Sequence, residues 1–318
     1  MSSLIEQAAK RLEQLRRAGA DVTDREVDPG EPSQQEETPT PEKVIRALDA
    51  RSAPSAPLPT ASPLDAPPAA LRTTTQHTEI DLSRLAARGF VTPNVPSSQL
   101  ADEFRVIKRP IIRNALGKDG ARIKNRNLIM VTSALPAEGK TFTAVNLAMS
   151  VAMEFDNTVL LIDGDVAHPT LPSLLGVPSE PGLLDLLTRD DLDLADALVR
   201  TNVQKLSVLP AGSRQRRATE LLASEQMVSL LRELSSRYSD RIIIFDSPPL
   251  LATTEARVLA THMGQIIMVV GADTTTHHEL NQALATIESC EIVLMMLNKA
   301  RKTDVGSYYG YYTDEDAP

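Results

Sequence analysis

The stretch "LIMVTSALPAEGKTFTAVNLAMSVAMEF" at residues 128–155 decides the fold. It opens with an apolar run that predicts a strand at 128–134 and closes with an amphipathic pattern that predicts a helix. Between them, Gly139, Lys140 and Thr141 match the end of the G-x-x-x-x-G-K-[ST] pattern, although Ala134 replaces its first glycine. In such a loop the backbone N–H groups cradle phosphates, the lysine reaches the β and γ groups, and the hydroxyl binds magnesium. The stretch therefore predicts a phosphate-binding loop.

Five more short apolar runs follow along the chain, and helical patterns separate them. They cover residues 157–165, 205–212, 241–249, 265–272 and 291–299. Strands that are apolar on both faces and alternate with helices predict an α/β fold, in which helices cover both faces of a mostly parallel sheet. Ligands of such sheets bind at the carboxyl ends of the strands. Candidate functional residues are therefore those that directly follow each apolar run.

Polar residues end several of these strands. Asp163 and Asp165 occupy alternate positions, so both carboxylates can face one site, and Asp246 ends "IIIFD". Asn298 and Lys299 end the last strand. Together with the phosphate-binding loop, these residues make a magnesium-nucleotide site the leading hypothesis. Asp163 is a candidate base or magnesium ligand, and the sequence leaves both roles open.

The tyrosines gather near the carboxyl end of the chain. Four of the five occur within "GSYYGYYTDEDAP" (306–318), at Tyr308, Tyr309, Tyr311 and Tyr312. A tail of this length cannot bury four rings in a core of its own, so either the rings dock elsewhere or their hydroxyls are used. Tyr308 lies nine positions after Lys299, a distance of roughly 30 Å when the chain is extended. The cluster can therefore reach a site on a neighbouring copy, and also one on its own chain.

The composition limits the partners and the cellular location that can be expected for the chain. The 318 residues carry 33 basic and 42 acidic side chains, a net charge of −9, which argues against nucleic acid as a partner. One cysteine fits a reducing compartment, and no signal peptide or membrane-spanning segment is expected. We expect a cytoplasmic protein that contacts the membrane through a partner. The expected organisation is an amphipathic N-terminal helix at 1–22, a Pro-rich disordered linker at 23–78, a nucleotide-binding domain at 79–300 and a flexible tyrosine tail at 301–318.

The combination of "PAEGKT", "DGD", "FDSPP" and the terminal tyrosine cluster resembles the bacterial tyrosine kinases. The segments "IDLSRLAARGFVTPN" and "ADEFRVIKRPIIRNA" look most like the cytosolic autokinases of exopolysaccharide loci associated with exosortase systems. The resemblance covers nearly everything except the linker. It implies a P-loop kinase that uses ATP and Mg²⁺ and phosphorylates the tyrosine cluster of a neighbouring subunit in a ring. It also implies activation by the cytosolic segment of a membrane protein that governs polysaccharide chain length.

The resemblance assigns roles to individual positions. The implied catalytic residues are Lys140, Asp163 and Asp165. The implied nucleotide-binding residues are Ala137, Glu138, Gly139, Lys140, Thr141, Phe142 and Asn298. The implied magnesium ligands are Thr141, Asp163 and Asp246, and the implied phosphorylation sites are Tyr308, Tyr309, Tyr311 and Tyr312. The family's oligomerisation pattern E-x-x-R-x-x-R appears as Asp102, Arg105 and Lys108.

Two positions separate alternative interpretations. Leu135 replaces the lysine that marks the related ATPases of septum placement and plasmid partition, which favours the kinase branch. Ala167, followed by His168, replaces an arginine found in many bacterial tyrosine kinases. Two rivals stay open: a P-loop ATPase that switches a partner without phosphorylating tyrosine, and a scaffold whose site no longer turns over.

Overall fold

The computed structural model describes residues 76–117, 123–237 and 240–300. The predicted N-terminal helix at 1–22, nearly all of the predicted linker at 23–78 and the tyrosine tail at 301–318 lie outside the described residues. The predictions for these segments therefore stay predictions. The described residues form the domain that carries the phosphate-binding loop.

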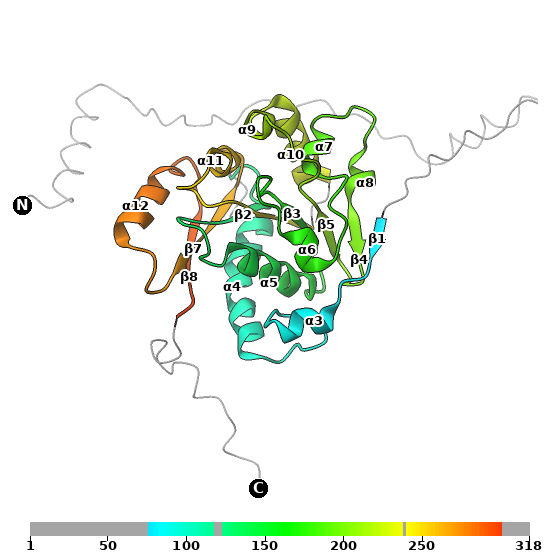
Figure 1. The fold of residues 1–318 in the computed structure, drawn as a ribbon. Coiled ribbons are helices and arrows are strands. Elements are labelled where there is room, and N and C mark those ends of the chain that lie inside the picture. Colours follow the sequence, from blue (N-terminus) through cyan, green and yellow to red (C-terminus); the bar gives the residue numbers. More distant parts are fainter. Residues whose placement is uncertain (1–75, 118–122, 238–239, 301–318) are drawn as a thin grey trace, which may run out of the picture. The chain divides into compact units, whose positions relative to one another are not determined.

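An eight-stranded sheet forms the centre of this domain (Figure 1). The strand order is β1-β4-β5-β3-β6-β2-β7-β8, and every neighbouring pair is parallel except β4 and β5. The strands are β1 (Gln76–Thr78), β2 (Leu128–Ser133), β3 (Thr158–Asp163), β4 (Val199–Thr201), β5 (Leu206–Leu209), β6 (Arg241–Asp246), β7 (Gln265–Gly271) and β8 (Val293–Asn298). All six predicted strands are present, and the prediction of a mostly parallel sheet is confirmed.

Helices cover both faces of the sheet, as predicted. One layer contains α3 (Leu82–Ala87), α4 (Gln99–Leu116), α5 (Lys140–Ala152) and α6 (Leu171–Leu175). The other contains α7 (Leu183–Leu186), α8 (Leu194–Ala197), α9 (Ala218–Leu222), α10 (Glu225–Arg237), α11 (Thr254–Ala260) and α12 (His277–Ala285). Alternate residues of β2 enter the two cores, with Val131 on one side and Met130 on the other. Among the described residues, no helix is long and apolar enough to cross a membrane.

The sheet differs from the prediction at its edges. The sequence pattern missed β1 and β4, because strands of three residues are too short to form an apolar run. The ordered domain therefore begins by Gln76, inside the stretch assigned to the linker. Edge strand β8 is not buried on both faces, since Met295 and Leu297 keep 63% and 62% of their surface exposed.

Helix α4 carries the three residues of the predicted oligomerisation pattern. Asp102 and Arg105 form an ion pair with each other on the exposed surface. Lys108 is buried, donates a hydrogen bond to the carbonyl of Ser150 (2.6 Å) and pairs with Glu154 (2.7 Å). The Lys108 ammonium group thus joins α4 to the end of α5, and the assignment of Asp102, Arg105 and Lys108 to an oligomer interface stays a prediction.

This difference predicts unequal effects on stability. Lys108→Ala should lower the free energy of unfolding by about 1–3 kcal/mol, because it leaves Glu154 and the Ser150 carbonyl without their cation. Arg105→Ala removes an exposed pair and should cost only about 0–1 kcal/mol. Urea unfolding of both variants measures the two values. Equal losses would contradict the structural role of Lys108.

Candidate functional site

The phosphate-binding loop joins β2 to α5, as the sequence predicts. Gly139 caps the amino end of α5 with φ +102°, and Ala137 also has a positive φ of +65°. These two left-handed positions turn the chain sharply from the end of the strand into the helix. Because the first N–H groups of α5 have no partner within the helix, they can bind an anion at this point.

The end of β8 holds the loop in place. The side-chain amide of Asn298 donates to the carbonyl of Glu138 (2.8 Å), and the Lys299 ammonium donates to the carbonyl of Ala137 (2.6 Å). The side chain of Asn298, predicted to bind nucleotide, is thus placed where it fixes the loop backbone. The anchoring role of Lys299 could not be read from the sequence, which showed only that it lies at this edge.

Glu138 is a second anchor. Its carboxylate is buried and accepts hydrogen bonds from the N–H groups of Leu135 (2.6 Å) and Gly271 (3.4 Å) and from the hydroxyl of Thr275. Gly271 ends β7, and Thr275 lies in the loop between β7 and α12. The Glu138 side chain therefore connects the phosphate-binding loop to β7, the neighbour of β2 in the sheet. The Glu138 side chain therefore faces inward, and its predicted contact with nucleotide stays a prediction for its backbone.

The Phe142 side chain also faces the protein interior. Its ring packs against Phe90 with the centroids 5.1 Å apart and lies against the core beneath α5. The side chain of Phe142 is part of the hydrophobic packing, so a contact with nucleotide would have to involve its backbone. The predicted contacts of Ala137, Glu138, Gly139, Lys140, Thr141, Phe142 and Asn298 with nucleotide stay predictions.

The close packing of Gly139 allows a direct test of the loop. A methyl group added at Gly139 would lie 2.0 Å from the amide nitrogen of Asn298, whereas one added at Gly89 meets nothing within 4 Å. Both glycines have a positive φ. Gly89→Ala should cost only the backbone strain of about 1–2 kcal/mol. Gly139→Ala should cost more and weaken nucleotide binding at least about tenfold, because it also displaces Asn298 from Glu138.

Thermal unfolding and calorimetric titration with nucleotide measure these two effects. The Gly89→Ala chain controls for the left-handed backbone alone. If both alanine variants bind nucleotide equally well, the contact between Gly139 and Asn298 does not support the loop.

Two aspartates lie beside the loop on adjacent strands. Strands β3 and β6 pair so that Asp163 stands directly next to Asp246. One oxygen of Asp163 accepts the N–H of Leu171 (3.0 Å), while its Oδ1 and both oxygens of Asp246 have no hydrogen-bond partner in the described part of the chain. The adjacent Ser247 hydroxyl is likewise buried without a partner there. Ser247 is a site residue that the sequence did not single out, although it follows Asp246 directly.

The surroundings of these carboxyl groups change their acidity. Burial, and then the charge of Asp246, raises the pKa of Asp163 to about 8. Burial raises the pKa of Asp246 to about 7, and the nearby Thr141 hydroxyl and the Lys140 charge oppose that rise, although no hydrogen bond of normal geometry joins Thr141 to Asp246. Burial also raises the pKa of Asp165, against the N–H of His168 and the charge of Lys140. The fold thus holds acidic groups together in a place where their negative charge is poorly solvated.

These residues fit a magnesium ion that arrives with a nucleotide. Unpaired buried oxygens of Asp163 and Asp246 are hard ligands, and the charge of Lys140 only partly offsets the burial of Asp246. Among the described residues there is no group of three or more His, Cys, Asp or Glu side chains that could hold a metal ion. Magnesium is commonly held by one or two carboxylates together with substrate phosphates, so two aspartates beside a phosphate-binding loop meet that requirement.

Of the residues predicted for the chemistry, the structure brings Lys140, Thr141, Asp163, Asp165 and Asp246 to one edge of the sheet. Lys140 is the first residue of α5, and the Thr141 hydroxyl lies 3.4 Å from that of Thr170. His168 is exposed, and its N–H donates to Asp165 (3.1 Å). Its charge also helps to lower the pKa of Asp165, against the effect of burial.

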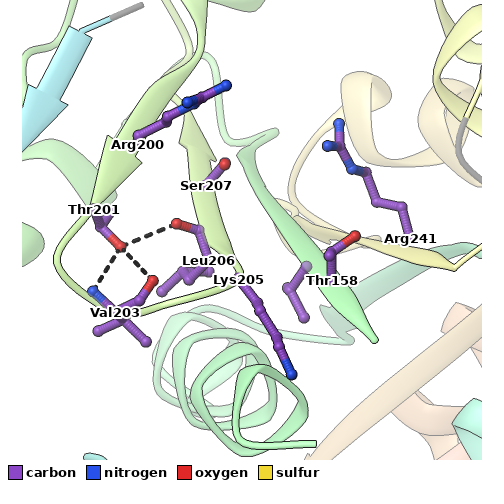
Figure 2. Close-up of a pocket in the computed structure, with 9 residues that line it drawn as sticks. Thr158, Arg200, Thr201, Val203, Lys205, Leu206, Ser207 and Arg241 are labelled. Atoms are coloured by element: carbon purple, nitrogen blue, oxygen red, sulfur yellow. Dashed lines mark hydrogen bonds between the residues drawn. The ribbon is translucent and has the colours of Figure 1, made fainter. Parts of the chain in front are cut away.

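The opposite edge of the sheet contains a basic cavity of about 210 Å³ (Figure 2). It is lined by Thr158, Val159, Arg200, Thr201, Val203, Lys205, Leu206, Ser207 and Arg241. The Lys205 ammonium already donates to the carbonyls of Glu154 and Phe155 (2.7 Å each), and the Thr201 hydroxyl bonds within its own turn. Because it lies at the amino ends of the parallel strands, this cavity is not part of the phosphate-binding site.

A parallel sheet with a loop of this geometry and buried aspartates at its carboxyl edge defines a P-loop ATPase fold. The model of the AAA domain family matches residues 128–299, more than half of the chain. The chain therefore belongs to this family.

Named relatives narrow the family further. The chain is 29% identical over 230 residues to tyrosine-protein kinase YwqD of Bacillus subtilis, covering 72% of this chain and 93% of YwqD. It is also 29% identical over 222 residues to putative tyrosine-protein kinase CapB of Staphylococcus aureus, covering 69% and 93%. The solved BceF tyrosine kinase domain aligns with a TM-score of 0.53 at 28% identity, over 70% of this chain and 91% of that domain. The resemblance to bacterial tyrosine kinases is thereby confirmed.

Proposed function

We propose that this protein is an ATP-dependent tyrosine autokinase whose substrate is its own C-terminal tyrosine cluster. The observation that carries the proposal is that Lys140 lies beside Asp246 at the phosphate-binding loop, with Asp163 next to Asp246 and three buried carboxylate oxygens of the two aspartates without a hydrogen-bond partner among the described residues. Such a site suits a magnesium-bound nucleotide. The kinase names of the relatives and the four clustered tyrosines favour a tyrosine hydroxyl as the acceptor.

The residues of the site have separate roles in this reaction. The loop backbone and Lys140 would bind the phosphates, and Thr141 and Asp246 would hold Mg²⁺, which neutralises phosphate charge when bound. Since Leu171 occupies one oxygen of Asp163, Oδ1 is the oxygen left to accept the tyrosine proton. The bond between the tyrosine oxygen and the γ phosphorus forms as the bond from that phosphorus to ADP breaks. The pKa of Asp163, raised to about 8, lies closer to that of a phenol than the pKa of an ordinary aspartate does, and only the ionised form, whose share grows with pH, accepts the proton.

Mass spectrometry of the purified full-length chain after incubation with Mg-ATP tests this function. We expect phosphate on Tyr308, Tyr309, Tyr311 and Tyr312 and none on a chain in which all four are phenylalanine. ATP hydrolysis without phosphotyrosine would instead support the non-kinase switch. The absence of nucleotide binding would support the scaffold.

We further propose that transfer occurs in trans within an oligomeric ring. Mixing an active chain that lacks the four tyrosines with a Lys140→Met chain that keeps them separates the two routes. Transfer in trans phosphorylates the Lys140→Met chain, and strict transfer in cis leaves it unmodified. Because phosphates add up to about −2 each to a tail that is already acidic, complete phosphorylation should reduce the particle size measured by light scattering. An unchanged size would contradict release of the ring.

We propose a cytoplasmic role in exopolysaccharide synthesis or export, with the protein held at the membrane by the cytosolic segment of a chain-length determinant protein. Support comes from the sequence resemblance to kinases of exopolysaccharide loci. The predicted amphipathic N-terminal helix is the candidate docking element. Deleting residues 1–20 should abolish co-purification with that segment. If the shortened chain still co-purifies, the docking element lies outside residues 1–20.

A further inference from the structure

Strand β8 leaves one side of its backbone open. It is the last strand in the sheet order and pairs only with β7 among the described residues. On that inner side, the Ile292 carbonyl accepts from Ile266 (2.9 Å) and the Asn298 carbonyl accepts from Ala272 (2.8 Å). Because the direction of the backbone groups alternates along a strand, the N–H and C=O groups of Met295 and Leu297 point to the open edge. This edge can accept another strand.

The same two residues also expose their side chains. Met295 and Leu297 are 63% and 62% exposed and stand on one face of β8, two positions apart. An open edge beside exposed apolar side chains favours pairing with another segment, since pairing satisfies the backbone and covers the side chains together. The segment that fits should place two large apolar groups at the same spacing.

The chain that continues from β8 has this pattern. Residues 307–313, "SYYGYYT", contain tyrosine and threonine, which favour strands, and Tyr309 and Tyr311 stand two positions apart. If the chain turns back antiparallel to β8, Tyr309 comes opposite Leu297 when Tyr311 comes opposite Met295. The intervening residues then form the return. If the pairing register shifted by one residue, Gly310 would replace one of the two tyrosines opposite Met295 and Leu297. The side chains of Tyr309 and Tyr311 would then lie on the other face of the sheet.

We propose that segment 307–313 of the same chain adds to the open edge of β8 as an antiparallel strand, with Tyr309 against Leu297 and Tyr311 against Met295. This contact goes beyond the kinase function, since it gives the unmodified tail a docking surface on its own domain. A docked tail is withheld from a neighbour's phosphate site. Phosphorylation would place charge against Met295 and Leu297 and release the tail, a step that alone rests on the proposed function.

Residue-resolved hydrogen exchange tests the docking without nucleotide. The full-length protein is compared with a chain that ends at residue 305. Deleting the tail should speed exchange at the N–H groups of Met295 and Leu297 at least tenfold. The N–H groups of Leu294 and Met296 point to β7 and serve as the internal control, which should not change. Equal exchange at Met295 and Leu297 in both chains would overturn the proposal.

Cross-linking tests the register and the identity of the occupant. In a Cys290→Ser background, Met296→Cys and Gly310→Cys would face each other in a pair about 4.5 Å apart between Cα atoms, within disulfide range. A disulfide within one chain is expected. Met296→Cys with Tyr311→Cys is the matched control and should not link, because its side chains lie on opposite faces. Links between chains would assign the edge to a second copy, and equal or absent linking of the two pairs would refute the register. Kinase activity affects neither test.

Discussion

Replacing Lys140 with methionine is expected to lower tyrosine phosphorylation by roughly 10²–10³-fold, the range seen when one charge-stabilising donor is removed from an active site. Lys140 begins α5 directly after Gly139, and its charge acts on both Asp165 and Asp246. Methionine keeps much of the length and apolar character of the side chain but removes its charge. Phosphate binding and charge neutralisation are thus lost while the packing around α5 is retained.

The rate of phosphotyrosine formation under Mg-ATP, measured by mass spectrometry, gives the size of this effect. Lys124→Met is the matched control, because Lys124 is an exposed lysine outside the site and should keep wild-type activity. If the Lys140→Met chain still phosphorylates its tyrosines at the wild-type rate, Lys140 has no role in the reaction. Thermal unfolding of both variants should show that neither has lost its fold.

Asp246→Asn is expected to abolish most of the activity and yet stabilise the nucleotide-free protein. Both oxygens of Asp246 are buried and without a hydrogen-bond partner among the described residues, so the folded chain carries a poorly solvated acid beside Asp163. An amide of the same shape has no charge to desolvate. It is also a weaker ligand for a hard cation than a carboxylate, which removes the proposed contact with Mg²⁺.

The effect on stability should depend on pH, and its sign is set by the direction of the shift. Burial raises the pKa of Asp246 from 3.8 to about 7 in the folded state. Between these values the folded chain binds a proton that the unfolded chain has released, so the free energy of unfolding falls as pH rises, by roughly 1.4 kcal/mol per pH unit for one such group. The contribution is fully present below the unfolded pKa and lost above the folded one. Asp246→Asn should remove this slope, and its advantage over the wild type should be greatest above pH 7.

Urea unfolding at pH 5, 6, 7 and 8 measures the slope. Asp156→Asn is the control, because Asp156 is exposed and lies away from the site. If Asp246→Asn has the same pH dependence as this control, Asp246 does not carry the raised pKa, and the account of the carboxylate pair fails.

Several features could be predicted because they depend on local pattern. Six apolar runs identified six strands, five of them in the interior of the sheet, where a strand buried on both faces must be largely apolar, and the sixth the edge strand β8. The parallel arrangement then placed Lys140, Asp163 and Asp246 at one edge, because the carboxyl ends of parallel strands lie together. The match of Gly139, Lys140 and Thr141 between a strand and a helix identified the loop despite the replacement at Ala134.

Other features depended on contacts between residues far apart in the sequence. The sequence places Lys108 in a predicted oligomerisation motif. In the structure it packs against the end of α5 and pairs with Glu154. The side chains of Glu138 and Phe142 belong to the same loop motif as Lys140, yet they turn inward, to the end of β7 and to Phe90. A motif specifies residue types and spacing, and the direction of a side chain depends on which neighbour satisfies it.

The sequence by itself determined the order of the six longer strands and the residues that come after each of them, because such a strand leaves an apolar run that can be recognised without knowing its partners. Only the tertiary structure decided that Asp163 and Asp246 stand side by side, that Asn298 and Lys299 hold the loop backbone, and that β8 leaves its outer edge open. The physical reason is that an apolar pattern encodes how deeply a segment is buried. Which strand lies beside it, and in which register, is decided by the packing of the whole sheet.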